Sequence, residues 1–259
     1  MPSEMIRDIA EAARKASRKL AVLSSAAKDT SLRHMAETLR HHATYLQEEN
    51  ARDLETAHAT GLSPAMIDRL TLSEKVIEGM ARGMEEIAEL PDPVGRITGM
   101  ARRPNGLVVG RMRIPLGVVA IIYESRPNVT ADAAALCLKS GNAVILRGGS
   151  EAIHSNAAIV KILRESLRST GIDPEAVGFI PVADRQAIMD MLRLEDLIDL
   201  VIPRGGEGLI RTVSENSLIP VLKHYKGVCH IFVDRQADLE KAYSICLNAK
   251  VQRLSLIHI

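Results

Sequence analysis

Two stretches decide the fold of this chain: Leu146-Arg147-Gly148-Gly149-Ser150-Glu151 and Ile202-Pro203-Arg204-Gly205-Gly206-Glu207-Gly208. In each, an apolar run ends in a glycine-rich loop, and an amphipathic run follows the loop. Repetition of strand, loop and helix in this order is typical of a nucleotide-binding sheet. We therefore predict an α/β fold with a mainly parallel sheet.

The pattern around these loops supports that prediction. Residues 117–123 form a continuous apolar run, as in a strand that is buried on both faces. Further strands are predicted at 143–146, 177–180 and 197–202, with shorter ones at 219–222 and 228–233. Helices are predicted between them at 131–139, 151–169 and 184–194, which makes the connections crossovers.

The first 95 residues are predicted to be helical. Apolar residues recur at helical spacing through 29–47, and Ser63-Pro64 places a capping residue before a proline at the first helical position. Thr71 and Glu74 have the spacing of a capping box. Pro91-Asp92-Pro93 then ends the helical pattern, since proline lacks the backbone donor.

Residues 96–114 predict a β-hairpin with a two-residue Asn105-Gly106 turn. Alternation of Arg111 and Arg113 with Met112 and Ile114 indicates one exposed face. A basic ribbon could bind RNA, but the chain has two Phe, four Tyr and no Trp to stack bases. We therefore favour an arm that pairs with another subunit, because an exposed edge strand readily pairs.

The composition excludes several classes of protein. The 259 residues are 46% apolar and 25% charged with a net charge of +1, so no strong field favours nucleic acid or a membrane surface. Three widely spaced cysteines form no CxxC pair, which predicts no metal site and a reducing compartment. No secretory leader or membrane-spanning run is apparent. We expect a cytoplasmic protein.

The two glycine-rich loops are candidates for binding a phosphorylated ligand. They follow parallel strands and so lie at the carboxyl edge of the sheet, where glycine lets the backbone approach a phosphate and the next helix presents free N–H groups. Arg147 suits the 2′-phosphate of an NADP ribose. In the alternative interpretation Arg147 lies in solvent and the glycines only turn the chain. Neither loop matches a standard phosphate-binding motif.

A third polar segment, Glu124 to Thr130, follows the first buried strand. Glu124 and Arg126 are candidate substrate contacts at this edge of the sheet. The amide of Asn128 could donate to a developing oxyanion. Alternatively, Asn128 and Thr130 only cap the helix that follows.

Five longer segments of the chain carry a family signature: YESRPNVT at 123–130, LCLKSGNAVILRGG at 136–149, IPRGG at 202–206, GVCHIFVD at 227–234 and NAKVQR at 248–253. Together they resemble the gamma-glutamyl phosphate reductase family of the aldehyde dehydrogenase superfamily. The resemblance implies NADPH-dependent reduction of L-glutamyl 5-phosphate to L-glutamate 5-semialdehyde, with release of phosphate, in proline biosynthesis.

The resemblance also implies an architecture and a distribution of roles. We expect a helical part of the cofactor domain at 1–95, a hairpin oligomerisation arm at 96–114, a Rossmann-like NADP-binding domain at 115–250 and the start of a catalytic domain at 251–259. Asn128 would be the oxyanion donor. Residues expected at the adenosine ribose and its phosphate are Arg147, Gly148, Gly149, Ser150 and Glu151, and those lining the pyrophosphate are Arg204, Gly205, Gly206 and Gly208.

The sequence departs from the family after Arg253. There the family continues with proline and, shortly after, a cysteine whose thiolate displaces the acyl phosphate, whereas this chain reads LSLIHI at 254–259. Cys137, Cys229 and Cys246 stand in apolar surroundings and are expected in the core. We interpret the chain as a truncated, inactive cofactor-binding portion. The alternative is a non-catalytic nucleotide-binding or assembly subunit that acts through the hairpin.

Overall fold

The computed structural model describes residues 2–224 and 230–251. The chain forms two compact units, Met1–Lys223 and His224–Ile259. Among the described residues, no helix combines the length and the apolar character needed to cross a membrane.

The first unit is built on a four-stranded parallel sheet, as predicted. Its strands are β3 (Val118–Tyr123), β4 (Ala143–Arg147), β5 (Val177–Phe179) and β6 (Leu200–Arg204), in the order β5-β4-β3-β6. Every residue of β3 is buried, which confirms a strand covered on both faces. The strand predicted at 219–222 is reduced to a single bridge between Val201 and Val221.

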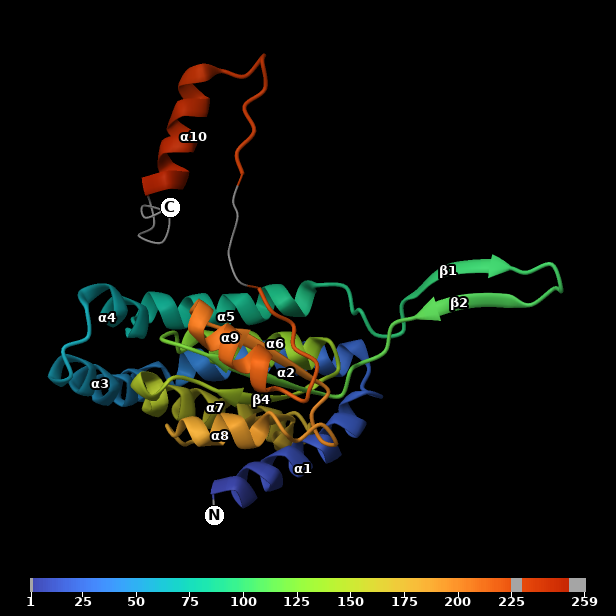
Figure 1. The fold of residues 1–259 in the computed structure, drawn as a ribbon, viewed down its shortest axis with the longest axis horizontal. Helices are drawn as coiled ribbons and strands as arrows, with labels where there is room; N and C mark the ends of the chain where they lie inside the picture. The colour runs from blue at the N-terminus through green and yellow to red at the C-terminus, as the bar shows by residue number, and fades with distance from the viewer. Residues whose placement is uncertain (1, 225–229, 252–259) are drawn as a thin grey trace. The chain divides into compact units, whose positions relative to one another are not determined.

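Helices cover both faces of this sheet (Figure 1). α6 (Asn128–Lys139) and α7 (Ile153–Ser169) contact each other and join β3 to β4 and β4 to β5, so right-handed crossovers place them on one face. α8 (Arg185–Met191) leads back across the sheet to β6 and contacts α1 (Pro2–Leu20) on the other face. α9 (Glu207–Asn216) follows β6. Two short 3₁₀ turns, η1 (Ser150–Ala152) and η2 (Pro174–Ala176), precede α7 and β5.

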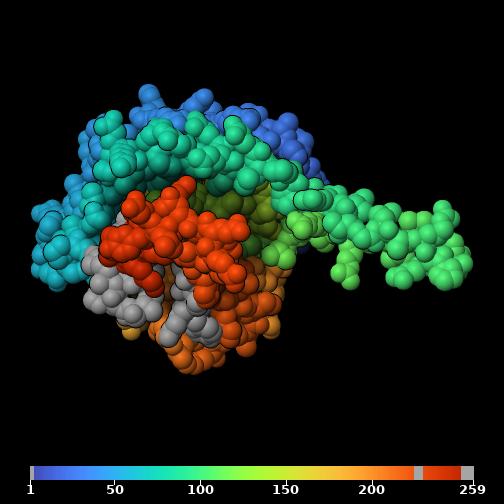
Figure 2. Space-filling view, turned by 90° about the horizontal axis from the view of Figure 1, so that it is seen from above, coloured from blue at the N-terminus to red at the C-terminus, as the bar shows by residue number. Residues whose placement is uncertain are grey.

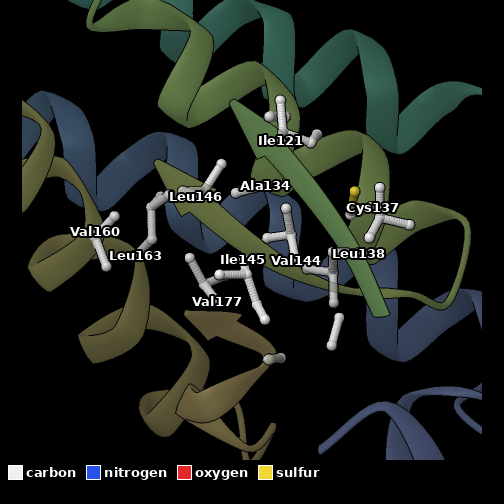
Figure 3. Packing of buried hydrophobic residues seen from close by; sticks show 14 of the residues in the cluster. Ile121, Ala134, Cys137, Leu138, Val144, Ile145, Leu146, Val160, Leu163 and Val177 are labelled. Carbon is white, nitrogen blue, oxygen red and sulfur yellow. The ribbon is translucent and has the colours of Figure 1, made fainter. Parts of the chain in front are cut away.

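Figure 3 shows the hydrophobic core between the sheet and the helices that pack on it. Side chains of α6 and α7 pack on β4 and its neighbours, and the labelled set is apolar throughout. Cys137 is part of this cluster and only 7% exposed, so its predicted core position is confirmed. Burial of this kind contributes about 25 cal/mol per Å² of apolar surface, which holds the strand ends in fixed positions.

The strand order creates a switch point at the carboxyl edge of the sheet. From β3 the chain moves outward through β4 to β5, then returns to place β6 on the opposite side of β3. Loops that follow β3 and β6 therefore diverge and leave a crevice, which is where open α/β sheets bind ligands. Glu124–Pro127 and Gly205–Gly206 are these loops.

The helical N-terminal part is confirmed, with two local corrections. The helix expected through 29–47 is two helices, α2 (Ser25–His41) and α3 (Ala43–Ala59), which meet at His42. The capping box at Thr71 is wrong: the Thr71 hydroxyl donates to Ile67 O and ends α4 (Pro64–Leu70), while Ser73 caps α5 (Glu74–Glu89). α5 ends just before the proline-rich segment, as expected.

Buried ion pairs fix the segment between α5 and the hairpin. Lys28, only 1% exposed, pairs with Asp92, and Lys139 pairs with Asp29 and donates to Ala88 O. Burial alone would raise the pKa of Asp92, but hydrogen bonds from Lys28, Ser25 and the Val94 N–H outweigh it and leave this pKa lowered. The root of the hairpin is therefore rigidly held.

The hairpin exists, but its turn and its exposure differ from the prediction. β1 (Ile97–Arg102) and β2 (Val108–Met112) pair antiparallel around a three-residue loop, Pro104–Gly106, closed by Arg103 N to Leu107 O at 2.7 Å. Pro104 suits the second position of a type I turn, and Gly106 follows it with φ +87°. Both faces are exposed rather than one, because no described residue packs on either (Figure 2).

In the second unit the structure describes one helix, α10 (Leu239–Val251). The strand expected at 228–233 is wrong for residues 230–233, which pair with no other described strand, and 228–229 lie outside the described residues. Cys246 was expected in a core but is partly exposed, since α10 buries none of its residues. The described part also leaves out Cys229, for which a core position was expected, and residues 252–259.

Candidate functional site

A cleft of about 490 Å³ opens at the carboxyl edge of the sheet. It lies between the loops after β3 and β4 and the helices α8 and α9. Its lining joins four parts of the sequence, which are Glu124, residues 147–151, residues 183–189 and residues 208–212. The crevice expected from the strand order is thus present.

Arg147 is the buried cation of this cleft. Its side chain is only 7% exposed, one guanidinium nitrogen donates to Ala183 O at 2.9 Å, and Nε has no hydrogen-bond partner. Burial lowers the pKa of Arg147, while the Glu151 and Glu124 carboxylates act in the opposite sense. A buried, incompletely bonded guanidinium suits an anionic ligand better than solvent, so the interpretation of Arg147 as a solvent-exposed strand end is wrong.

The two glycines after Arg147 make room for protein side chains. A Cβ at Gly148 would collide with the Asn156 amide, and one at Gly149 would collide with the Glu151 carboxylate. Gly149, Ser150 and Glu151 line the cleft, whereas Gly148 does not. The Glu151 carboxylate also accepts hydrogen bonds from Ser125 N at 2.6 Å and Ser125 Oγ at 3.0 Å.

The hydrogen bonds that Glu151 accepts from Ser125 stabilise a strained turn. Ser125 has φ +51°, the one positive φ among the described non-glycine residues. Such a conformation is unfavourable for a residue with a Cβ unless its surroundings hold it. Glu151, expected at the cofactor ribose, therefore already links the loop after β4 to the loop after β3.

The N-terminus of α7 is closed by another side chain, which corrects the expectation of free N–H groups there. The buried Asp53 of α3 accepts hydrogen bonds from His154 N at 3.1 Å and from Ser155 N at 2.8 Å. Since these donors are taken, a phosphate in the cleft must find its backbone donors elsewhere.

The second glycine-rich loop meets the cleft at α9. Gly208 lines the cleft, and a Cβ there would meet nothing within 4 Å. Gly206 N donates to Glu124 Oε2 at 2.9 Å, and a Cβ at Gly205 would collide with the same carboxylate. Arg204 is exposed and outside the lining. Of the four residues predicted for this loop, Gly208 alone lines the cleft, and the pyrophosphate role of the loop stays a prediction.

The residues that form the walls of the cleft were not predicted from the sequence. They are apolar on both sides, with Ile188 and Met189 from α8 and Leu209 from α9, and a second arginine, Arg185, lies at the rim. Apolar faces with a cation beside them suit a flat heterocycle that carries a phosphate. The apolar faces of α8 and α9 could have indicated these residues, but only the fold turns them toward one space.

Neither Asn128 nor Thr130 caps α6, so that alternative is wrong. The Asn128 amide donates to Asp132 Oδ2 at 3.3 Å, and the Thr130 hydroxyl bonds to Tyr123 and to Asn156 in the core. Asn128 is half-buried at the start of α6, and Arg126 is exposed and outside the cleft. The oxyanion role of Asn128 and the substrate role of Arg126 stay predictions.

Comparisons with known proteins point to one family. The model of the aldehyde dehydrogenase family matches residues 1–253. Gamma-glutamyl phosphate reductase from Geobacter sp. strain M21 is 61% identical over 251 residues, covering 97% of this chain and 60% of the relative. The same enzyme from Desulfotalea psychrophila is 58% identical over 250 residues, covering 96% of this chain and 60% of its own length.

A solved structure gives the same answer for the fold. The crystal structure of gamma-glutamyl phosphate reductase from Thermotoga maritima superposes with a TM-score of 0.89 at 43% identity, covering 96% of this chain and 60% of that one. The chain thus spans about 60% of the length of the curated relatives it matches.

Proposed function

Because this chain belongs to the aldehyde dehydrogenase family, we propose that it forms the NADP-binding part of an enzyme that reduces L-glutamyl 5-phosphate to L-glutamate 5-semialdehyde, with release of phosphate, in proline biosynthesis. Membership of a dehydrogenase family implies a nicotinamide cofactor, which supplies the hydride. The observation that carries the choice of NADP is the buried Arg147 guanidinium in the cleft. We also place the protein in the cytoplasm.

The described residues fit such a cofactor. Ile188, Met189 and Leu209 would hold the adenine ring, Arg147 and Arg185 the ribose phosphate, and the α9 N-terminus near Gly208 the pyrophosphate. Ser150 and Glu151 lie beside Arg147 on the same cleft. The unsatisfied Nε of Arg147 supports an anion at this place, since buried polar groups are generally paired.

The described thiols do not supply the nucleophile that the reaction needs. Burial raises the pKa of Cys137 to about 12, so its thiolate is scarce at neutral pH. Cys246 belongs to the second unit and is not among the residues that line the cleft. Because the relatives are considerably longer, we propose that the complete reductase activity requires residues beyond this chain.

Titration with NADPH tests the proposal directly. We expect saturable binding by this chain, in the micromolar range usual for cofactors and substrates, measured by NADPH fluorescence. Phosphate-dependent reduction of NADP⁺ with glutamate 5-semialdehyde should be undetectable. Absence of NADPH binding by a folded chain would refute the proposal, and turnover would refute its inactive state.

We further propose that the hairpin 96–114 joins copies of this chain. Its strands expose Ile97, Met100, Val108 and Met112 on a two-stranded ribbon, an arrangement that is marginally stable alone and readily pairs. Arg113 N donates to Arg96 O at 3.0 Å, so two glycines could replace 97–112. Sedimentation should show an oligomer for the unaltered chain and a monomer for this variant, with melting temperatures within a few degrees. Equal masses would contradict the proposal.

A further inference from the structure

The Glu124 carboxylate is held at the carboxyl edge of the sheet by a backbone hydrogen bond. Its Oε2 accepts from Gly206 N at 2.9 Å, and Gly206 is the residue that precedes the first turn of α9. A carboxylate at a helix N-terminus is stabilised by the backbone donors and by the helix dipole. This bond spans 82 residues of sequence and joins the loop after β3 to the loop after β6.

Space, rather than backbone conformation, explains the glycine at position 205. Its φ lies outside the left-handed region, so other residues could adopt the same backbone. A Cβ there would instead collide with the Glu124 carboxylate and approach Leu209 Cδ2 to 2.8 Å. Gly205 therefore keeps open the position that the carboxylate occupies.

A separate observation indicates that an anion belongs in the same cleft. Arg147 is more than nine-tenths buried, lines the cleft together with Glu124 and Gly208, and has an Nε without a partner. The Glu151 and Glu124 carboxylates line the same cleft, and their negative charges partly balance that of the guanidinium. The protein thus supplies the negative charge that a bound phosphate would otherwise bring.

We propose that Glu124 is an internal competitor for the phosphate site, whose carboxylate holds the Gly206 N–H until a pyrophosphate-bearing ligand displaces it. This inference rests on the proposed function, because it assigns a regulatory contact to the same cleft. The displaced carboxylate can move into solvent, since Glu124 is exposed and the Gly206 N–H is the backbone donor that holds it. Ligand affinity is therefore lower than the cleft would otherwise provide.

Two substitutions test the competition. Glu124→Ala removes the carboxylate, and Glu124→Gln removes its charge while keeping its size. Both should tighten NADPH binding, by about fivefold for Glu124→Ala and less for Glu124→Gln, since a carboxylate at a helix N-terminus is worth about 1 kcal/mol. Without ligand, both variants should melt a few degrees lower, and ligand should raise their melting temperatures more than it raises that of the unaltered chain.

Glu207→Gln is the matched control. Glu207 stands in the first turn of the same helix, and its carboxylate pairs with Arg211 at 2.8 Å, whereas the Gly206 N–H donates to Glu124. Removing its charge should change NADPH affinity by less than about twofold. An equal gain in Glu207→Gln would mean that charge alone, and not the Gly206 contact, is responsible, which overturns the inference.

A second probe separates this inference from the proposed function. Calorimetric titration with inorganic pyrophosphate measures the affinity of the anion site for a ligand that has no nicotinamide. If NADPH binds no variant but pyrophosphate binds Glu124→Ala more tightly, the competition stands and the cofactor assignment fails. Unchanged or weaker binding of both probes by folded Glu124 variants overturns the competition, as does failure of pyrophosphate to bind any of them.

Discussion

Replacing Arg147 by methionine is expected to weaken NADPH binding by about 10- to 100-fold. The guanidinium is the buried cation of the cleft, and a charge-assisted hydrogen bond to it contributes about 1.5–3 kcal/mol. NADH lacks the ribose phosphate, so its affinity should fall much less. Fluorescence titration of both nucleotides measures the two ratios on the same protein.

Arg185→Met is the comparison for this prediction. Arg185 also lines the cleft but is exposed, so solvent screens its charge and its loss should weaken NADPH binding only a few-fold. Arg147→Lys keeps the charge but not the planar fork, and should give an intermediate affinity. If Arg185→Met reduced the binding of NADPH more than Arg147→Met, the phosphate would have been assigned to the wrong arginine.

Replacing Asp53 by alanine is expected to lower the free energy of unfolding by about 3 kcal/mol. Asp53 is 2% exposed and accepts three hydrogen bonds at the start of α7, from His154 N, Ser155 N and Ser155 Oγ. Alanine would leave these donors buried without partners, and losing bonds to a charged acceptor has a cost of this order. For a unit of this size the melting temperature should fall by about 10 °C.

Asp184→Ala provides the control for a capping aspartate without burial. Asp184 caps α8 through Gln186 N at 2.9 Å, but the residue is exposed and close in sequence to its partner. Its loss should lower the free energy of unfolding by about 1 kcal/mol or less. Urea unfolding of both variants gives the comparison, and equal losses would show that the long-range contact of Asp53 adds nothing.

The secondary structure was largely predictable because its signals are local. Apolar runs bounded by glycine placed β3, β4 and β6 to within a few residues, and the Pro91–Pro93 segment marked the end of α5. Errors arose where two local signals compete. Thr71 could cap α5 or end α4, and it ends α4 because its hydroxyl bonds to Ile67 O.

The exposure of the hairpin is a second feature that local sequence signals predict incorrectly. Alternation of basic and apolar residues predicted one exposed face, yet both faces of β1 and β2 are exposed. Alternation reports which side chains share a face and says nothing of whether another surface covers that face. The sequence of residues 96–114 therefore does not predict which surface covers the apolar side chains of the hairpin.

For the candidate site, local patterns predict that glycine-rich loops end parallel strands and that Arg147 stands at one of them. Which side chain occupies each helix N-terminus follows from the folded chain alone. Asp53 closes α7 from 101 residues away, and Glu124 reaches Gly206 across 82 residues. Strand and helix periods are readable because they follow from neighbouring residues. Contacts between side chains far apart in the sequence depend on the strand order and the path of the chain, which local patterns do not encode.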